Sequence, residues 1–373
     1  MITISFLGDI MLGRFVAEQH LKSPYQLVSE EVLGKIQESD VCIANLESPV
    51  VTCSSEDSLK FAANKDLLTQ FNWVSCFSLS NNHINDFGNQ GMVETIAALN
   101  NQGFVHNGLY QGEYTPYLIE KQGERIAVIT CADMMNYEFS EDCPYKTLRV
   151  NRPDEIIKTI AEYKQKGFFV ILFAHVGMLF TRFPNPVIRE FLHQMIDKGA
   201  DCIVTAHPHC LGGYEYYGDK LIVYSLGDFL MDGASYRRRR AGVLNISILD
   251  GILENWKIIP VETDDNLSVR LPVSGVEKSM MNDFQFVSKQ MIKHADSYLS
   301  FYKKQYKKEL IAHSLSTLKF EFKRRGLIGL FKTLFKRIGA VKGVTKRVFT
   351  DRSSMSYDSD AVNENNISIN DIR

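Results

Sequence analysis

Two histidines on one short turn have the spacing to bind a metal ion together. His207 and His209 follow an apolar run in the segment TAHPHC, residues 205–210, with a single proline between them. Because proline fixes its own φ angle, the turn loses little conformational entropy when it presents both imidazoles. Neutral imidazole is a common ligand of divalent metals. The pair therefore predicts one part of a metal centre, which other segments must complete.

Further side chains with metal-binding atoms follow other short apolar runs. The candidate set is Asp9, Asn45, Glu47, Asn82, His83, His175, His207 and His209. Carboxylates, imidazoles and amides together suit borderline divalent ions such as Zn, Mn, Fe or Co. A carboxylate that bridges two such ions holds them roughly 3.5–4 Å apart, where they polarise a phosphoryl oxygen and lower the pKa of bound water. The set is therefore typical of phosphoester chemistry.

Each candidate also has a purely structural interpretation. A single histidine after a strand is more often a hydrogen-bonded, half-buried side chain than a metal ligand. Asp9 could cap a helix or close a turn, and the segment 81–83 could itself be a turn. The metal hypothesis therefore depends on whether these residues meet in space.

The apolar runs predict an α/β fold that would bring them together. Runs of strand length occur at residues 2–7, 41–44, 74–79, 168–174, 202–205 and 221–226, and helical patterns separate several of them. Buried strands of parallel sheets have such continuous apolar sequences. In open α/β sheets, ligands bind at the carboxyl ends of the strands. The candidates stand at these ends.

Five ordered segments resemble the CapA-type family, which is named for poly-gamma-glutamate capsule synthesis. They are FLGDIMLGR (residues 6–14), ANLESPV (44–50), SLSNNHINDFG (78–88), FAHVG (173–177) and GADCIVTAHPHCLGGYEYYGDKLIVYSLGDF (199–229). The family is itself similar to the calcineurin-like metallophosphoesterases. The resemblance covers about residues 1–262 and implies a four-layer αββα sandwich with a metal centre at the strand ends, followed by a C-terminal helical extension.

The resemblance assigns the first metal site to Asp9 and His209, with Glu47 as the carboxylate that bridges to a second site. One position departs from the phosphoesterase pattern: the residue two places after the aspartate is Met11 rather than histidine. A thioether is a poor ligand for hard or borderline cations. The sequence therefore leaves open whether the protein binds one or two divalent ions (Mn, Zn or Fe). Asp228 could add a carboxylate nearby.

The same resemblance assigns the second metal site to Asn82, His175 and His207. It gives His83 the protonation of the leaving group or stabilisation of the transition state, so the expected catalytic residues are His83, Asp9 and Glu47.

Substrate contacts are expected from a further group of polar residues. These are Asn45, Asp228, Arg237, Arg238, Arg239 and Arg240. A run of arginines is usually a solvated loop, but guanidinium groups beside a phosphate-handling site can bind phosphate or an anionic polymer.

The sequence changes character after residue 262. Residues 263–315 predict a linker and a helical extension, residues 316–349 a basic amphipathic segment, and residues 350–373 a disordered tail. Residues 323–349 contain no acidic residue, and their apolar positions fall on one helical stripe. Such a segment is typical of contact with an anionic inner membrane leaflet or with a partner protein. The alternative is a terminal helix packed on its own domain.

Bulk composition sets broader limits. The 373 residues include 45% hydrophobic and 23% charged residues with a net charge of −2, which is typical of a soluble globular protein and gives no reason to expect a nucleic-acid partner. Seven cysteines without a CxxC pair argue against a disulfide framework. No signal peptide or membrane span is visible. We therefore expect a cytoplasmic protein, either free or attached peripherally at the inner leaflet.

These features lead to two hypotheses of different classes. The first is a metal-dependent phosphoesterase-like hydrolase of capsule, exopolysaccharide or poly-gamma-glutamate biosynthesis, acting on a phosphoester or an anionic surface-polymer precursor. The second is a non-catalytic accessory or scaffold subunit of a polymer synthesis or export complex. A third, amide-bond chemistry on poly-gamma-glutamate, is disfavoured because no ATP-binding loop is visible.

Overall fold

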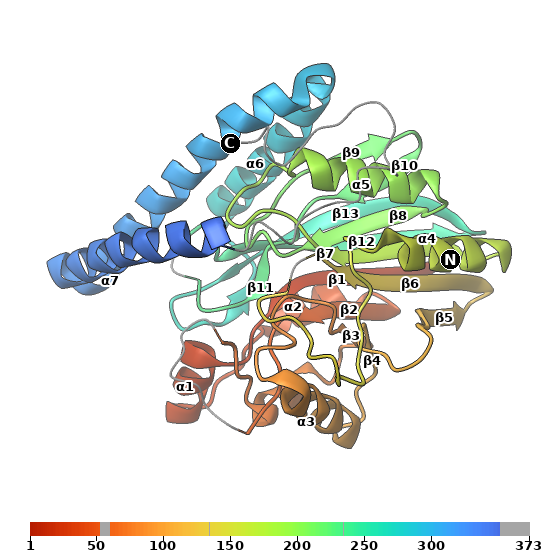
Figure 1. Ribbon diagram of the computed structural model, residues 1–373, viewed down its shortest axis with the longest axis horizontal. Helices are drawn as coiled ribbons and strands as arrows, with labels where there is room; N and C mark the ends of the chain where they lie inside the picture. The colour runs from red at the N-terminus through yellow and green to blue at the C-terminus, as the bar shows by residue number, and fades with distance from the viewer. Residues whose placement is uncertain (53–59, 134, 234, 351–373) are drawn as a thin grey trace.

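Two β-sheets form the centre of the protein in the computed structural model. The structure describes residues 1–52, 60–133, 135–233 and 235–350; for residues 324, 325 and 327–350 it describes the backbone only. The larger sheet has the order β14-β13-β12-β1-β2-β3-β4, with β11 also paired to β1 (Figure 1). Its strands are β1 (Ile2–Ile10), β2 (Val41–Leu46), β3 (Cys76–Ser78), β4 (His106–Asn107), β11 (Asp228–Leu230), β12 (Arg240–Leu249), β13 (Ile252–Thr263) and β14 (Val269–Arg270).

The smaller sheet has the order β5-β6-β7-β8-β10-β9. Its strands are β5 (Tyr117–Lys121), β6 (Glu124–Ala132), β7 (Phe169–His175), β8 (Cys202–Ala206), β9 (Tyr214–Tyr217) and β10 (Lys220–Val223). In both sheets the central strands run parallel, so their carboxyl ends lie along one edge.

Helices cover the outer face of each sheet. Those on the larger sheet are α1 (Arg14–Lys22), α2 (Glu30–Gln37), the 3-10 helix η1 (Lys65–Phe71) and α3 (Gly88–Asn101); those on the smaller sheet are α4 (Pro153–Gln165) and α5 (Pro186–Asp197). The face of each helix that meets its sheet is apolar. In α5, for example, Ile188, Leu192 and Met195 are buried, which is the spacing of one helical face.

A third apolar core fills the space between the sheets. Ile4 and Phe6 of β1 pack there against Phe173 of β7, with the two phenylalanine rings 5.4 Å apart. Alternate residues of β1, such as Leu7, face the helices on the other side. Strands of this kind must be apolar on both faces, which explains their continuous apolar sequence. The predicted four-layer α/β sandwich is confirmed.

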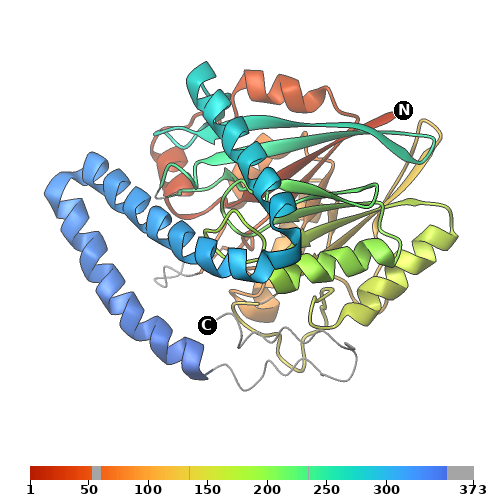
Figure 2. The same ribbon diagram turned by 90° about the horizontal axis from the view of Figure 1, so that it is seen from above.

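The C-terminal part continues the fold. It consists of α6 (Ser274–Lys293), the 3-10 helix η2 (Ala295–Ser297) and α7 (Tyr298–Thr350), and α6 packs on β9 and β13. Tyr302 of α7 is fully buried in the core of the smaller sheet. Residues 263–315, predicted as a linker and extension, thus pack against the sandwich. Helix α7 bends at Gly326, where φ is +61° (Figure 2).

The prediction for the basic segment stays open. Its backbone is helical to Thr350, but the side chains of residues 324, 325 and 327–350 and all of residues 351–373 lie outside the described part of the chain, as does Cys53. The other cysteines carry free thiols, as predicted. Among the described residues, no helix combines the length and apolar character needed to cross a membrane.

Candidate metal centre

The register of the sheets brings the candidate ligands to one edge. Asp9 of β1 lies opposite Asn45 of β2 and opposite Asp228 of β11. In the smaller sheet, His175 at the end of β7 lies opposite Ala206 at the end of β8, and His207 follows directly. Parallel strands that end together therefore explain why residues distant in the sequence meet.

The approach of β1 to β11 requires glycine. A Cβ atom on Gly8 would lie 1.9 Å from the carbonyl oxygen of Gly227, so any side chain at position 8 would separate the two strands. Each glycine is followed by an aspartate of the site, Asp9 or Asp228. The tight packing of backbone against backbone thus sets the distance between these carboxylates.

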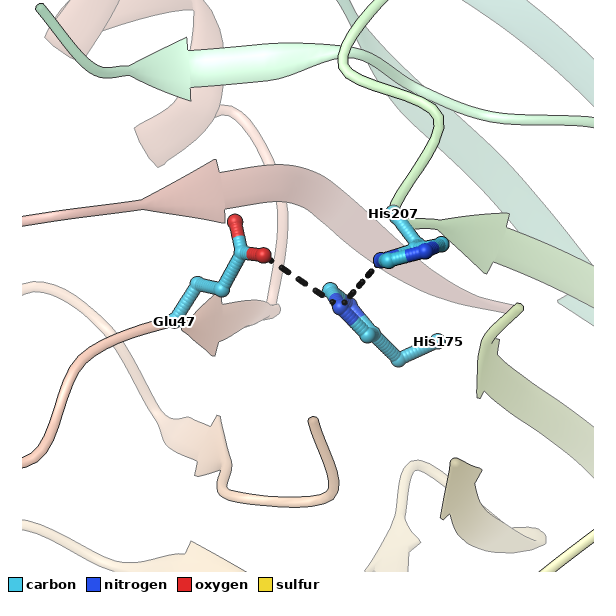
Figure 3. Close-up of side chains that lie close together, drawn as sticks. All are labelled: Glu47, His175 and His207. Atoms are coloured by element: carbon cyan, nitrogen blue, oxygen red, sulfur yellow. Dashed lines mark hydrogen bonds and ion pairs between the residues drawn. The ribbon is translucent and has the colours of Figure 1, made fainter. Parts of the chain in front are cut away.

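One group of potential ligands consists of Glu47, His175 and His207 (Figure 3). The Nε2 atom of His175 lies 3.4 Å from Glu47 Oε1 and 3.0 Å from His207 Nδ1. The amide oxygen of Asn82 is 2.7 Å from the same Nε2 atom. The structure thus brings together all the residues predicted for the second metal site.

A second group consists of Asp9, His209 and Asp228. The Nδ1 atom of His209 is 2.7 Å from Asp228 Oδ1 and 3.7 Å from Asp9 Oδ2. Glu47 Oε2 is 3.8 Å from the same nitrogen. Glu47 therefore directs one oxygen to each group, as a bridging carboxylate would.

The carboxylate of Glu47 provides a test of whether a cation fits here. Both its oxygens are buried, and among the described residues neither has a donor at hydrogen-bonding geometry. Its nearest charged neighbours are the imidazoles of His175 and His209, at 3.4 and 3.8 Å. A buried carboxylate that accepts no hydrogen bond is costly, and a bound metal cation would neutralise it. Three carboxylates, three imidazoles and one amide are oxygen and nitrogen donors suited to Mn, Zn or Fe. The residues fit one or two divalent ions.

The electrostatics of the site follow from burial among carboxylates. Burial alone would lower the pKa of His175, but its contacts with Asp9 and Glu47 raise that pKa to about 9. Burial and the neighbouring charge of His175 hold the pKa of His207 well below its usual value. Without a cation, one imidazole is thus protonated and the next is neutral. Neutral imidazoles are the form that binds a metal.

The turn that carries the histidine pair is strained. His207 and His209 have φ values of +102° and +55°, a region that costs non-glycine residues about 1–3 kcal/mol each. Two hydrogen bonds hold the turn: His207 N–H donates to Asp9 Oδ2 at 3.1 Å, and Phe180 N–H donates to the carbonyl of Pro208 at 2.8 Å. In this backbone conformation, each imidazole lies in one of the two ligand groups.

Met11 lies outside both groups of ligands. It is fully buried, and its sulfur accepts a hydrogen bond from Gly13 N–H at 3.1 Å. Asp228 belongs to the group of Asp9 and His209. This is the first metal site, which lacks the imidazole expected at position 11. Of the two roles that the sequence left open for Asp228, its place in this group fits the further carboxylate near the first site.

Asn45, also predicted to contact substrate, contacts residues of both ligand groups. Its Nδ2 atom donates to Asp9 Oδ1 at 2.8 Å and lies 3.2 Å from His175 Nδ1. Asn81 in turn donates to Asn45 Oδ1 at 3.3 Å. Such outer hydrogen bonds fix the orientation of first ligands.

His83 follows Asn82 in the chain and lies outside both groups of ligands. Its Nδ1 atom is 2.7 Å from Asp86 Oδ2, and its ring stacks on Phe61 with centroids 3.7 Å apart. Asn136 Nδ2 is 3.2 Å from His83 Nε2. Sequence analysis missed Asp86, although its spacing of three residues from His83 was a usable signal. With the carboxylate on Nδ1, Nε2 is the ring nitrogen that can exchange a proton, and Asn136 is its neighbour there.

The four arginines have different environments. Arg238 Nε is 3.3 Å from Asp228 Oδ2, whereas Arg237 Nη1 is 2.9 Å from Glu309 of α7. Arg239 is buried and donates to Asp265 and to backbone carbonyls. Arg240 begins strand β12. Only the guanidinium of Arg238 is placed by these contacts against a ligand of the site.

Stacked sheets with helices outside and this cluster at the strand ends define a metallophosphoesterase-like α/β sandwich protein. The family comparison agrees with that class. The chain belongs to the family described as bacterial capsule synthesis protein PGA_cap, whose model matches residues 3–233.

Several relatives carry names from the same area of biology. PGA biosynthesis protein CapA of Bacillus subtilis (strain 168) is 27% identical over 272 residues, which is 70% of this chain and 71% of that protein. Capsule biosynthesis protein CapA of Bacillus anthracis is 27% identical over 281 residues, or 71% and 68% of the two chains. Probable polyglutamine synthesis accessory protein Rv0574c of Mycobacterium tuberculosis (strain ATCC 25618 / H37Rv) is 26% identical, covering 62% and 74%.

A crystal structure of a hypothetical protein from Thermus thermophilus is also similar. It covers 70% of this chain and 99% of that chain, with 14% identity and a TM-score of 0.43.

Proposed function

We propose that this protein is a metal-dependent phosphoester hydrolase that serves the synthesis of an anionic capsule polymer. The observation that carries the proposal is the buried carboxylate of Glu47, which lies between two groups of ligands and has no hydrogen-bond donor among the described residues. The names of the Bacillus relatives support a place in capsule or polyglutamate biosynthesis.

The protein's own residues divide the work of such a site. Glu47, His175, His207 and Asn82 would hold one ion, and Asp9, His209 and Asp228 a second. Bound there, divalent ions would polarise a phosphoryl oxygen and lower the pKa of water.

Two residues beside the ions would handle the substrate. His83 donates a proton to the leaving oxygen, and Asp86 fixes the imidazole for that transfer by accepting from Nδ1. Arg238, next to Asp228, binds a negatively charged group of the substrate. These assignments make the substrate an anionic phosphoester.

A metal analysis tests the proposal, with Glu47→Gln as the decisive variant. We expect wild-type protein to bind Mn²⁺ and to hydrolyse bis-p-nitrophenyl phosphate, and Glu47→Gln to lose both properties. Glu124→Gln is the matched control, because Glu124 is also a buried carboxylate but accepts from Asp250 and Gly251 N–H groups in another part of the fold. Wild-type protein that binds no metal would refute the proposal.

The second candidate function is that of an accessory subunit without turnover. The name of the mycobacterial relative favours it. A protein that binds metal stoichiometrically but hydrolyses no member of a phosphomonoester and phosphodiester panel would support this function over the first.

We also propose that residues 323–349 attach the protein to an anionic inner leaflet from the cytoplasmic side. Nine basic and no acidic residues in this segment would each contribute on the order of 1 kcal/mol near such a surface. The fourfold variant Lys332→Glu, Lys336→Glu, Lys342→Glu and Lys346→Glu should abolish sedimentation with phosphatidylserine vesicles. Equal sedimentation of wild type and variant would refute the attachment.

A further inference from the structure

Helix α7 places a buried carboxylate between two loops of the candidate site. Glu309 is 4% exposed. It accepts hydrogen bonds from Arg182 Nε and Nη2 at 3.1 and 2.9 Å, and from Arg237 Nη1 at 2.9 Å. We call these three residues the Glu309 clamp. Charge-assisted, bidentate contacts of this kind are the strongest and most directional in proteins.

Each arginine of the clamp belongs to a loop that borders the metal ligands. Arg182 lies between β7, which ends in His175, and α5. Arg237 lies between β11, which begins with Asp228, and β12. Helix α7 runs beside the sandwich on this side (Figure 1). One residue of the C-terminal helix therefore binds an arginine from each of two loops beside the candidate site.

The neighbour of Arg237 is the arginine that faces the site. The Arg238 side chain is 16% exposed, with Nε 3.3 Å from Asp228 Oδ2 and Nη2 2.9 Å from the Met231 sulfur. A guanidinium has five N–H donors, and among the described residues nothing accepts from Arg238 Nη1. The Arg238 guanidinium is mostly buried, lies beside Asp228 and has N–H donors left over. It is therefore suited to bind a phosphate or carboxylate group of a substrate.

A second contact of α7 supports the same wall. His313 stacks on Phe180 with ring centroids 4.1 Å apart and planes 3° apart. Phe180 has a φ of +65°, and its ring centroid lies 6.0 Å from that of His209 and 5.5 Å from Arg238 Cζ. The stack therefore holds a strained residue between a metal ligand and the open arginine.

We propose that α7 completes the substrate site, and that Glu309 is a positioning residue which sets Arg238 to receive an anionic group of the substrate. The proposal rests on the hydrolase function proposed above. Without the Glu309 charge, Arg182 would keep its ion pair with Asp283 at 3.1 Å, but Arg237 would lose its counter-ion. The loop that carries Arg238 would lose one of its anchors. Glu309 itself touches no ligand of the centre in the contacts described, so its loss should leave metal binding intact.

The test compares Glu309→Gln with Glu215→Gln in the full-length, manganese-loaded protein. Glu215 is a matched control: it is also 4% exposed and accepts from Nε and Nη2 of one arginine, Arg189, but contacts no loop of the clamp. Both variants should lower the melting temperature. Only Glu309→Gln should speed amide hydrogen exchange in residues 235–240 and weaken inorganic phosphate binding, about tenfold or more, at unchanged manganese content.

Amide exchange and calorimetric phosphate binding need no turnover, so they report on the clamp even if no phosphoester is hydrolysed. If Glu309→Gln does not fold, Arg237→Met removes one pair and leaves Arg182 on Glu309; it should show the same faster exchange and weaker phosphate binding. Unchanged exchange and phosphate affinity in these variants, or equal changes in Glu215→Gln, would overturn the proposal.

Discussion

Asp9 and Asp228 lie opposite each other on the parallel strands β1 and β11, and each ends the tripeptide Leu-Gly-Asp. The glycines allow the backbones to touch, and the aspartates that follow share the imidazole of His209. The first metal site, which lacks a histidine at position 11, thus has the two carboxylates of Asp9 and Asp228. Its preference should shift toward ions that favour oxygen, such as Mn²⁺.

Loss of Asp228 should therefore weaken one side of the centre. We expect Asp228→Asn to lower Mn²⁺ affinity by at least about tenfold, because that side would keep only Asp9, His209 and the bridging oxygen of Glu47. Titration calorimetry with MnCl₂ measures the change. Asp201→Asn is a suitable control, since Asp201 is buried at the start of β8 and pairs with Lys164. Identical titrations for wild type and Asp228→Asn would show that Asp228 is not a ligand.

The close approach of β1 and β11 gives a prediction about glycine. Gly8→Ala should lower both the melting temperature and the Mn²⁺ content, because its Cβ would lie 1.9 Å from a carbonyl oxygen. Gly34→Ala in α2 is the control: nothing lies within 4 Å of its Cβ, and alanine should stabilise the helix by about 0.5–1 kcal/mol. Thermal unfolding and metal analysis of both variants test this. A Gly8→Ala protein with full metal content would contradict the geometry.

The pairing of His83 with Asp86 gives a prediction about catalysis. Asp86→Asn should lower kcat for phosphodiester hydrolysis, within the roughly 10²–10⁴-fold range of general acid–base catalysis, because the amide no longer fixes the proton-donating form of the imidazole. His83→Gln should lose as much or more. Metal content should stay at the wild-type level in both. A normal kcat in His83→Gln would assign leaving-group protonation to another residue.

A buried ion pair remote from the centre predicts how stability depends on pH. Burial alone would raise the pKa of Glu215, but His193, Arg189 and Tyr224 lower it to about 2 from an ordinary value of 4.5. Since the folded state holds the carboxylate ionised, this stabilisation is present above pH 4.5 and is lost as the pH falls toward 2. It amounts to about 3 kcal/mol.

Urea unfolding of wild type and Glu215→Gln at several pH values tests this prediction. The difference in unfolding free energy should be full at pH 7 and should shrink steadily below pH 4.5. A difference that is constant from pH 7 to pH 3 would mean that the ionised carboxylate contributes nothing beyond its hydrogen bonds.

Sequence reasoning predicted most of the fold and the position of the site, for a physical reason. Parallel buried strands have recognisable apolar sequences, and their carboxyl ends share an edge of the sheet, so polar residues such as Asp9 and Asn45 in one sheet, or His175 and His207 in the other, had to lie near each other. The four-layer sandwich follows from the same strands, because both faces of β1 and β7 need cover.

Contacts between distant parts of the chain could not be predicted in this way. Glu309 meets Arg182 and Arg237 across 127 and 72 residues, and no periodicity records such a pairing. Nor does a run of four arginines show which one faces a ligand. The strand of Asp228, β11, has only three residues, and its pairing with β1 is visible only in space, so the sequence left Asp228 open between a substrate contact and a further carboxylate of the centre.

The position of Glu309 in the chain has a consequence for synthesis of the protein. Every residue of the two ligand groups lies at or before Asp228, so a ribosome completes the metal-binding segments well before it reaches α7. Until then Arg182 and Arg237 lack their shared counter-ion. A nascent chain, or one that ends before α7, would thus hold the metal-binding segments while the Arg237 guanidinium lacks its Glu309 partner, and the clamp forms only after α7 has been translated.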